Sequence, residues 1–353
     1  MLTIDLSALA RNYDTLKAQV APTCTVAGVV KANGYGTGAI EAAMALYKRG
    51  CRTFFVAHET EGVTLRKVMP HDIEIAIFNG LGTGSIEGFK THKLIPCLSS
   101  QKDVILWHET SLPAILNFDT GMSRLGFSNT DTETILADPS PLSDLKLRAI
   151  MSHLVSSEEP ANSLNDIQLE RFQKIVSLFP DTPKSLANSS GIYLGEPYHF
   201  DMVRPGYALY GGNPTPTLKN PMNHVVTLAP EILQIKQVQA GATAGYNSTY
   251  TFPRDTHIAV LNIGYADGLL RLASNRASFN FQGVPCPIRG RVSMDLTIVE
   301  LPDTLPTIPK EGDRLELLGA SQSVDTLADI IGTNGYEILT SLGTRYKREY
   351  ISN

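Results

Sequence analysis

A lysine stands at the end of an apolar run close to the N-terminus. Residues 26–30 read VAGVV, Lys31 follows, and glycines occupy positions 34, 36 and 38. A lone lysine at a strand end commonly extends to solvent, and glycine N–H groups can bind a phosphate. A phosphate-binding loop, however, places its lysine after the glycines. A third interpretation is a Schiff base with a carbonyl cofactor, because desolvation by an apolar strand favours the neutral amine.

Polar side chains follow most of the other apolar runs in the same way. At the mouth of a barrel of parallel strands, residues at the C-terminal strand ends meet and form the active site. The residues that close the predicted strands are therefore candidates for one shared site: Lys31, Asn33, Tyr35, His58, Asn79, Asp119, Arg124, His153, Asn188, Ser189, Ser190 and Arg204.

Apolar runs and helical patterns alternate over the first 212 residues. Continuous apolar strands that alternate with helices are typical of a parallel sheet covered on both faces. Eight strand–helix units predict a (β/α)8 barrel of the TIM type, with a doubly wound open sheet as the alternative. The predicted strands are 26–30, 53–57, 73–78, 93–98, 114–118, 145–154, 184–188 and 202–211, and helical patterns include 39–50, 101–109 and 165–179.

The pattern changes after a proline-rich segment, 213–221. Strand-like runs then follow one another without helices between them, separated by glycine and proline, which predicts a mainly antiparallel β domain. We expect strands within 231–238, 244–252, 256–268, 279–301 and 313–319, and two short helices at 324–332 and 336–343.

The composition narrows the class of protein. The 353-residue chain is 42% hydrophobic and has a net charge of −5, which fits two globular domains and argues against a nucleic-acid binder. Four dispersed cysteines without a CxxC pair indicate reduced thiols in a cytoplasm. The sequence contains no HxxxH or HxH pair, so we expect no metal site. Asp5 and Arg11 interrupt any signal-peptide core, and no run approaches the roughly 20 apolar residues of a membrane span.

Seven motifs, in order, resemble the alanine racemases, which are fold-type III pyridoxal-phosphate enzymes. The motifs are VVKANGYGTG (29–38), FDTGMSRLGF (118–127), MSHLVSSEEP (151–160), LANSSG (186–191), FDMVRPGYALYG (200–211), AGYNSTYTF (244–252), and the pair IGYADG (263–268) and GRVSMD (290–295). The resemblance implies a pyridoxal-phosphate-binding barrel over 1–225 and a C-terminal β domain over 226–353. It also implies a homodimer with shared active sites that interconverts L- and D-alanine for peptidoglycan synthesis.

Residue roles follow from the resemblance by position. Lys31 is expected to hold the cofactor covalently and to act as one base, and Tyr246 of the partner subunit as the other. His153 and Arg204 are expected to ease deprotonation of that tyrosine, and Arg204 also to face the pyridine nitrogen. Further expected roles are the phosphate cradle (Tyr35, Ser189, Gly206, Tyr207), the substrate carboxylate (Arg124), the partner's substrate side (Met294, Asp295) and the entrance (Tyr265).

Two positions depart from the family pattern. Asn117 stands where many members have a carbamylated lysine, which predicts a bound anion, chloride, between Asn117 and Arg124. Thr344 stands where many members have a tyrosine that reaches the cofactor phosphate, and Thr344, a water or Tyr346 are the candidates to replace it.

Three rival functions remain open: a racemase of another amino acid such as serine, a decarboxylase of the same fold type, and a pyridoxal-phosphate carrier.

Overall fold

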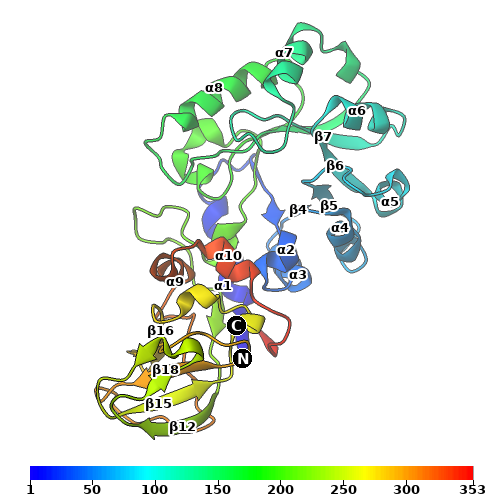
Figure 1. The fold of residues 1–353 in the computed structure, drawn as a ribbon. Helices are drawn as coiled ribbons and strands as arrows, with labels where there is room; N and C mark the ends of the chain where they lie inside the picture. Colours follow the sequence, from blue (N-terminus) through cyan, green and yellow to red (C-terminus); the bar gives the residue numbers. More distant parts are fainter. Residues whose placement is uncertain (353) are drawn as a thin grey trace.

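Parallel strands form a closed barrel in the N-terminal part of the chain (Figure 1). The computed structural model describes residues 1–352. β2 (Thr25–Val26) and β3 (Gly28–Val29) are two halves of one strand, which pair with β10 on one side and β4 on the other. The sheet therefore closes with eight strands, as predicted. The others are β4 (Thr53–Val56), β5 (Glu74–Ile77), β6 (Leu94–Leu98), β7 (Pro113–Asn117), β8 (Lys146–Met151), β9 (Lys184–Ser185) and β10 (Met202–Val203).

Helices cover the outside of the barrel (Figure 1). Serine side chains cap several of them: Ser85, Ser100 and Ser128 each accept a hydrogen bond from the backbone N–H three residues on, which satisfies a helix-end donor. The helices are α1 (Leu6–Lys17), α2 (Lys31–Tyr35), α3 (Ala39–Lys48), α4 (Glu59–Arg66), α5 (Ile86–His92), α6 (Gln101–His108), α7 (Asn129–Ala137) and α8 (Leu164–Val176).

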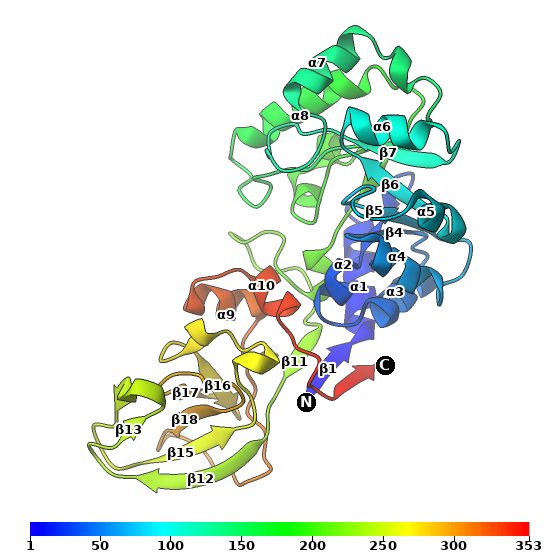
Figure 2. The ribbon, with the colours of Figure 1, turned by 45° about the vertical axis from the view of Figure 1, so that its right-hand side comes forward.

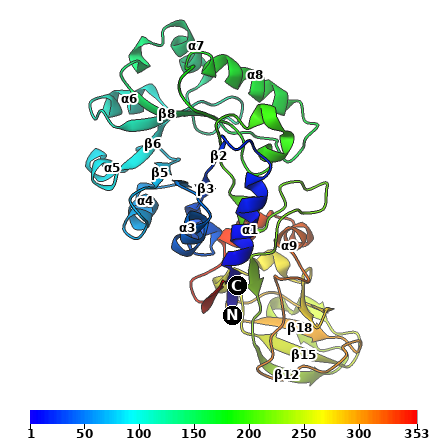
Figure 3. The same cartoon turned by 180° about the vertical axis from the view of Figure 1, so that it is seen from behind.

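The last two barrel strands depart from the predicted strand–helix alternation. Glycines and prolines follow them closely, and only 3-10 turns form: η2 (Gly191–Leu194), η3 (Glu196–Tyr198) and η4 (Tyr207–Tyr210). Helix α1, which precedes the first strand, covers this side instead (Figure 3). The Asn12 amide donates to the carbonyls of Leu209 and Asn223, at 3.1 and 2.9 Å.

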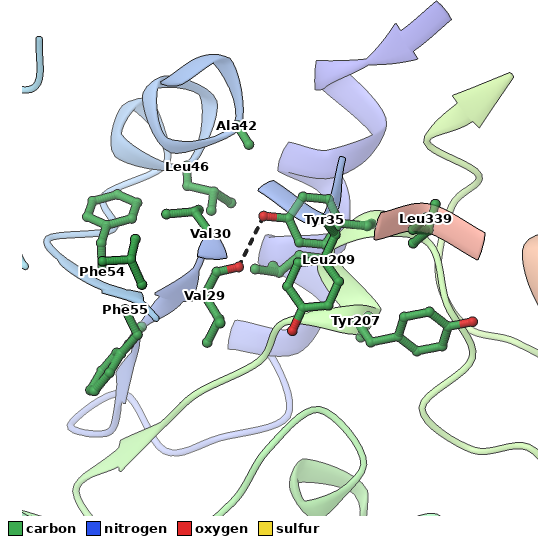
Figure 4. Close-up of a cluster of buried hydrophobic side chains, with 14 of the residues drawn as sticks. Val29, Val30, Tyr35, Ala42, Leu46, Phe54, Phe55, Tyr207, Leu209 and Leu339 are labelled. Carbon is green, nitrogen blue, oxygen red and sulfur yellow. Dashed lines mark hydrogen bonds between the residues drawn. The ribbon is translucent and has the colours of Figure 1, made fainter. Parts of the chain in front are cut away.

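The barrel strands are apolar because both of their faces are covered. All four residues of β4 are buried, among them Phe54 and Phe55. Figure 4 shows Val29 and Val30 of the first strand beside these rings, with Leu46 of α3 on the outer side. Burial of each such side chain stabilises the fold by about 1.5–3 kcal/mol. The first strand is thereby fixed in place just before Lys31.

The C-terminal part contains antiparallel strands, as predicted (Figure 1). Its largest sheet has the order β12–β15–β18, and two hairpins and two helices accompany it. Residues 313–319, predicted as a strand, make only isolated bridges, because their pairing alternates between different partners. The elements are β12 (Ile232–Val238), β13 (Thr243–Ala244), η5 (Tyr246–Ser248), β14 (Tyr250–Thr251), β15 (Thr256–Leu261), η6 (Tyr265–Asp267), η7 (Arg271–Ala273), β16 (Ser278–Phe281), β17 (Val284–Pro287), β18 (Thr297–Leu301), α9 (Val324–Ile331) and α10 (Gly335–Thr340).

The two ends of the chain meet in a third sheet (Figure 2). β1 (Leu2–Asp5) lies between β11 (Val226–Leu228), to which it is antiparallel, and β19 (Arg348–Ile351), to which it is parallel. β1 therefore pairs with segments on the far side of the predicted domain boundary at residue 225. Within residues 1–352, no helix is both long enough and apolar enough to cross a membrane.

Candidate active site

A cavity of about 240 Å³ opens at the C-terminal ends of the barrel strands. It brings together six of the polar residues that the sequence places at strand ends, from five different strands. Apolar side chains complete its wall. The lining residues are Lys31, Phe78, Asn79, Asn117, Phe118, Asp119, Met122, Arg124, Leu125, Met151, Ser152, His153 and Arg204.

Lys31 opens a turn of left-handed backbone. The four residues after it have φ values of 52°, 53°, 60° and 53°, although only Gly34 among them is a glycine. Each non-glycine residue in this region costs roughly 1–2 kcal/mol, so the turn holds strain that its surroundings must offset. Close packing also requires a glycine at position 36, where a Cβ atom would lie 2.2 Å from the Leu339 carbonyl oxygen.

Two charged side chains hold this turn from opposite sides. Glu61 accepts the Ala32 N–H at 2.7 Å, and its second oxygen accepts the N–H groups of Ala57 and His58 at the end of β4. Arg348 of β19 donates to the Gly36 carbonyl at 3.1 Å. The sequence analysis missed both residues. Glu61 binds a backbone N–H and Arg348 binds a backbone carbonyl, and such backbone partners leave no pattern in the sequence.

The Lys31 amine lies at the wall of the cavity, where burial disfavours its charged form. Its Nζ is 5.3 Å from the centre of the Phe78 ring, a cation–π contact that by itself favours the charged amine, but burial outweighs it. Burial, together with the positive charge of Arg124, lowers the pKa of Lys31, and Glu61 opposes this shift only in part. Lys31 is thus better prepared to act as a nucleophile or base than a solvent-exposed lysine.

Arg204 lies at the base of the cavity with one donor left over. Its terminal nitrogens donate to the Ser185 hydroxyl and to the Ser152 carbonyl, the latter at 2.6 Å. Among residues 1–352, its buried Nε has no hydrogen-bond partner. Burial lowers the pKa of Arg204 to about 10, so the side chain stays charged at neutral pH. An unpaired donor of a buried cation is the kind of group that a ligand acceptor satisfies.

His153 is surrounded by cations. Burial, followed by the charges of Arg204, Arg124 and Lys31, lowers its pKa to about 3. The imidazole is therefore neutral under physiological conditions and can accept a hydrogen bond. With Arg124 and Arg204 at its wall, the cavity suits an anionic ligand.

The loop that carries Arg124 is fixed from within. The Asp119 carboxylate accepts the N–H groups of Gly121, Met122 and Arg124 at 2.8–3.0 Å. The Asn117 amide donates to the Leu125 carbonyl at 3.0 Å and to the Ser99 hydroxyl at 3.2 Å. Both amide hydrogens of Asn117 are thus engaged within the protein, and the anion predicted between Asn117 and Arg124 would depend on the arginine for its donors.

Three of the four residues predicted for a phosphate cradle come together. The Ser189 hydroxyl accepts the N–H groups of Gly206 and Ala208, at 3.0 and 3.2 Å. A Cβ atom on residue 206 would lie 2.2 Å from the Tyr35 hydroxyl, so only glycine leaves this hydroxyl access to the loop. The fourth residue, Tyr207, contributes its backbone to the same loop, while its side chain turns away to Asp325.

The remaining predicted site residues lie outside this cavity. Tyr246, Tyr265 and Met294 are 67%, 45% and 53% exposed. Tyr265 and Met294 share a corner, because the Tyr265 N–H donates to the carbonyl of Ser293 at 3.0 Å. Asp295 pairs with Arg345 at 2.8 Å. In a single chain, therefore, Tyr246 does not join Lys31, Arg204 and His153 at the cavity wall.

A tyrosine other than the predicted candidate Tyr346 lies beside the predicted phosphate cradle. Tyr346 is surrounded by protein, and its hydroxyl has no hydrogen-bond partner among residues 1–352. The aromatic ring that approaches the cradle is instead Tyr336 of α10, whose centre is 6.2 Å from that of Tyr35. The sequence analysis predicted the helix that carries Tyr336 but assigned the residue no role.

Along nearly its whole length, the chain resembles proteins of one kind. The sequence profile described as "Alanine racemase, N-terminal domain" matches residues 4–214, and that described as "Alanine racemase, C-terminal domain" matches residues 225–350. The chain belongs to the alanine racemase family. This confirms both the resemblance and the class of enzyme drawn from the seven motifs.

Individual alanine racemases agree in sequence and fold. The enzyme of Acidiphilium cryptum is 45% identical, over 98% of this chain and 97% of that protein. A relative from Mesorhizobium japonicum, 43% identical over 99% of this chain and 93% of its own length, is named as a catabolic alanine racemase. The crystal structure of the Bartonella henselae enzyme, with covalently bound pyridoxal phosphate, has a TM-score of 0.95 at 39% identity and covers 99% of both chains. The predicted fold class is thereby confirmed.

Proposed function

We propose that this protein interconverts L- and D-alanine, with pyridoxal phosphate as its cofactor and two bases on opposite faces of the substrate. The observation that carries the proposal is the barrel cavity, in which a partly desolvated lysine lies among two arginines and a neutral histidine. Membership of the alanine racemase family supports the choice of reaction.

The residues of the cavity fit the proposed cofactor. Lys31 would hold it covalently through Nζ. The unpaired Nε of Arg204 would have an acceptor in the pyridine nitrogen, and the loop of Ser189 and Gly206, with the Tyr35 hydroxyl beside it, would hold the phosphate. An arginine keeps its proton, so it would leave the pyridine nitrogen unprotonated. Reprotonation at Cα is then favoured over transfer of the amino group.

When bound, pyridoxal phosphate withdraws electrons from the amino acid and makes its Cα–H acidic. Once the amino group of the substrate has replaced it on the cofactor, the freed Lys31 Nζ would take this proton from one face of Cα or return it, and its lowered pKa keeps more of the amine in the neutral form that this step requires. Arg124 holds the substrate carboxylate from its fixed loop. These positions leave the opposite face of Cα without a base from the same chain.

Tyr246 of the partner subunit supplies that base in this proposal. Its exposed position, shared with Tyr265 and Met294, suits a side chain that completes the site of a second copy in a two-fold dimer. A free phenol has a pKa of about 10, so a base at neutral pH needs positive charge beside it. Arg124 and Arg204 provide that charge, and neutral His153 can accept the phenol hydrogen bond.

The domain division, the location and the physiological role are part of the proposal. Residues 1–225 would form the cofactor-binding domain and residues 226–353 the domain that completes the partner's site. Four buried free cysteines suit a reducing cytoplasm. The product D-alanine would supply peptidoglycan synthesis, and deletion of the gene would then make growth depend on added D-alanine.

Deuterium exchange tests the reaction. The protein is mixed with pyridoxal phosphate and L-alanine in deuterated water, and optical rotation and exchange at Cα are followed together. Loss of rotation with one deuterium per turnover supports racemisation. Release of carbon dioxide would favour a decarboxylase, cofactor binding without turnover would favour a carrier, and faster turnover of serine would change the substrate.

A further inference from the structure

Tyr207 belongs to the loop of the phosphate cradle, but its side chain is bound to the C-terminal part of the chain. Its hydroxyl donates to Asp325 Oδ1 of α9 at 2.6 Å. Its ring stacks on Tyr336 of α10, with the centres 4.1 Å apart and the planes 14° from parallel. One residue thus ties the barrel loop to two helices more than a hundred residues away in sequence.

The surroundings of Tyr207 are shaped for this side chain. A Cβ atom on Gly212 would lie 2.1 Å from the ring, and one on Gly335 would lie 1.6 Å from the hydroxyl. Asp325 is itself fixed, because its second oxygen accepts the Asn213 N–H at 3.1 Å. A ring placed between two glycines and bonded to a doubly held carboxylate has little freedom to move.

Tyr336 extends the contact to the other side of the cradle. Its ring is 6.2 Å from that of Tyr35, and Tyr35 stacks on Tyr210 at 4.7 Å. The cradle hydroxyl of Tyr35 and the backbone of Tyr207 are therefore both backed by α10.

We infer that helices α9 and α10 set the spacing of the phosphate cradle, with Tyr207 and Asp325 as positioning residues that hold it through their mutual hydrogen bond. The inference rests on the proposed cofactor and adds the source of the cradle's rigidity. It gives this chain, in which Thr344 replaces the expected tyrosine, a means of phosphate binding that needs no additional hydroxyl at the phosphate.

Cofactor titration of the full-length protein tests the inference. Tyr207→Phe keeps the ring stack and removes the hydrogen bond, and Asp325→Asn weakens the same bond from the other side. Each variant is freed of cofactor and titrated with pyridoxal phosphate and, separately, with pyridoxal, which lacks the phosphate. We expect the dissociation constant for pyridoxal phosphate to rise about tenfold in both variants, and that for pyridoxal to stay within about twofold.

Tyr198→Phe is the matched control. Its hydroxyl donates to Asp166 of α8 at 2.8 Å, a bond of the same type away from the cradle loop. This variant is expected to bind both compounds as the unmodified protein does. Unchanged binding of pyridoxal phosphate in Tyr207→Phe would overturn the inference, as would equal weakening of both compounds, which would indicate general loosening. If the unmodified protein binds neither compound, the proposed function fails, and the inference with it.

Discussion

The mouth of the barrel and the exposed corner around Tyr246 differ in almost every physical respect. At the mouth, Arg204 is buried with an unpaired donor, and a strained turn aims Lys31 into a cavity. In the second region, Tyr246 is 67% exposed and stands in a short turn between two-residue strands. The first region is organised before any ligand arrives, whereas the second is organised for contact.

This difference shows how the proposed chemistry is divided. Strain and buried charge need a rigid barrel around them, and the turn after Lys31 has such support from Glu61 and Arg348. Large apolar side chains exposed together usually mark a contact surface. A base that must approach the substrate from outside the barrel can therefore come from the surface of a second copy.

The largest effect is expected from Lys31→Ala. This change would remove the proposed covalent attachment and one of the two proposed bases, so racemisation should fall at least ~10⁴-fold. The rate is measured by optical rotation, and borohydride reduction reports covalent attachment of the cofactor. Lys146→Ala, at the opposite end of β8, is the control and should keep both. Residual racemisation within tenfold of the unmodified protein would remove Lys31 from the mechanism.

A smaller, one-sided loss is expected from Tyr246→Phe. Proton removal from L-alanine should fall about 10²–10³-fold, more than removal from D-alanine, because the phenol serves one face only. Mixing this variant with Lys31→Ala subunits should restore about a quarter of full activity, since half of the dimers then carry one intact site. Verified subunit exchange without any recovery would contradict a shared site.

The contact surface itself can be tested without touching either base. Leu272 is 52% exposed, and its turn adjoins the Tyr246 hairpin through the bond from Asn275 to the Thr249 carbonyl. Leu272→Glu should dissociate the proposed dimer and lower activity roughly tenfold at low protein concentration, while cofactor binding persists. Sedimentation and titration measure the two properties. Ile308→Glu, an exposed change elsewhere in the β domain, should alter neither.

The smallest effect concerns the pH dependence of stability. His153 has a pKa of about 3 in the folded chain against 6.5 unfolded, so acid protonates the unfolded state first. The contribution of His153 to the free energy of unfolding is complete above pH 6.5 and is lost as the pH falls toward 3. His153→Asn should reduce this slope for the cofactor-free protein, by at most about 1.4 kcal/mol per pH unit. Urea unfolding at several pH values measures the pH slope of stability. Equal slopes in the variant and the unmodified protein would indicate that the His153 ring is exposed to solvent.

The sequence predicted what repeats along the chain. Apolar runs closed by polar residues indicated the barrel, and Lys31, Arg124, His153 and Arg204 do meet at its mouth. The family resemblance added roles for residues such as Tyr246, whose place in a strand-rich segment carries no chemical signal of its own.

Contacts between distant segments escaped the sequence analysis. Glu61 binds a backbone N–H, Asp325 binds a tyrosine that already had an assigned role, and β1 pairs with strands at the other end of the chain. None of these has a local pattern, because backbone donors and strand edges are present at every residue. The left-handed turn after Lys31 was equally hidden, since alanine and tyrosine, which stand at positions 32 and 35, rarely adopt this conformation.

The position of β1 has a consequence for synthesis of the protein. This strand is synthesised before the barrel strands, yet one of its two neighbours, β19, is synthesised after them. The barrel can therefore close while β1 still has an open edge, and the edge is covered only once β19 has been made. The same late strand carries Arg348, which holds the turn after Lys31. A nascent chain would thus complete the support of the turn after Lys31 only when β19 has been synthesised and has paired with β1.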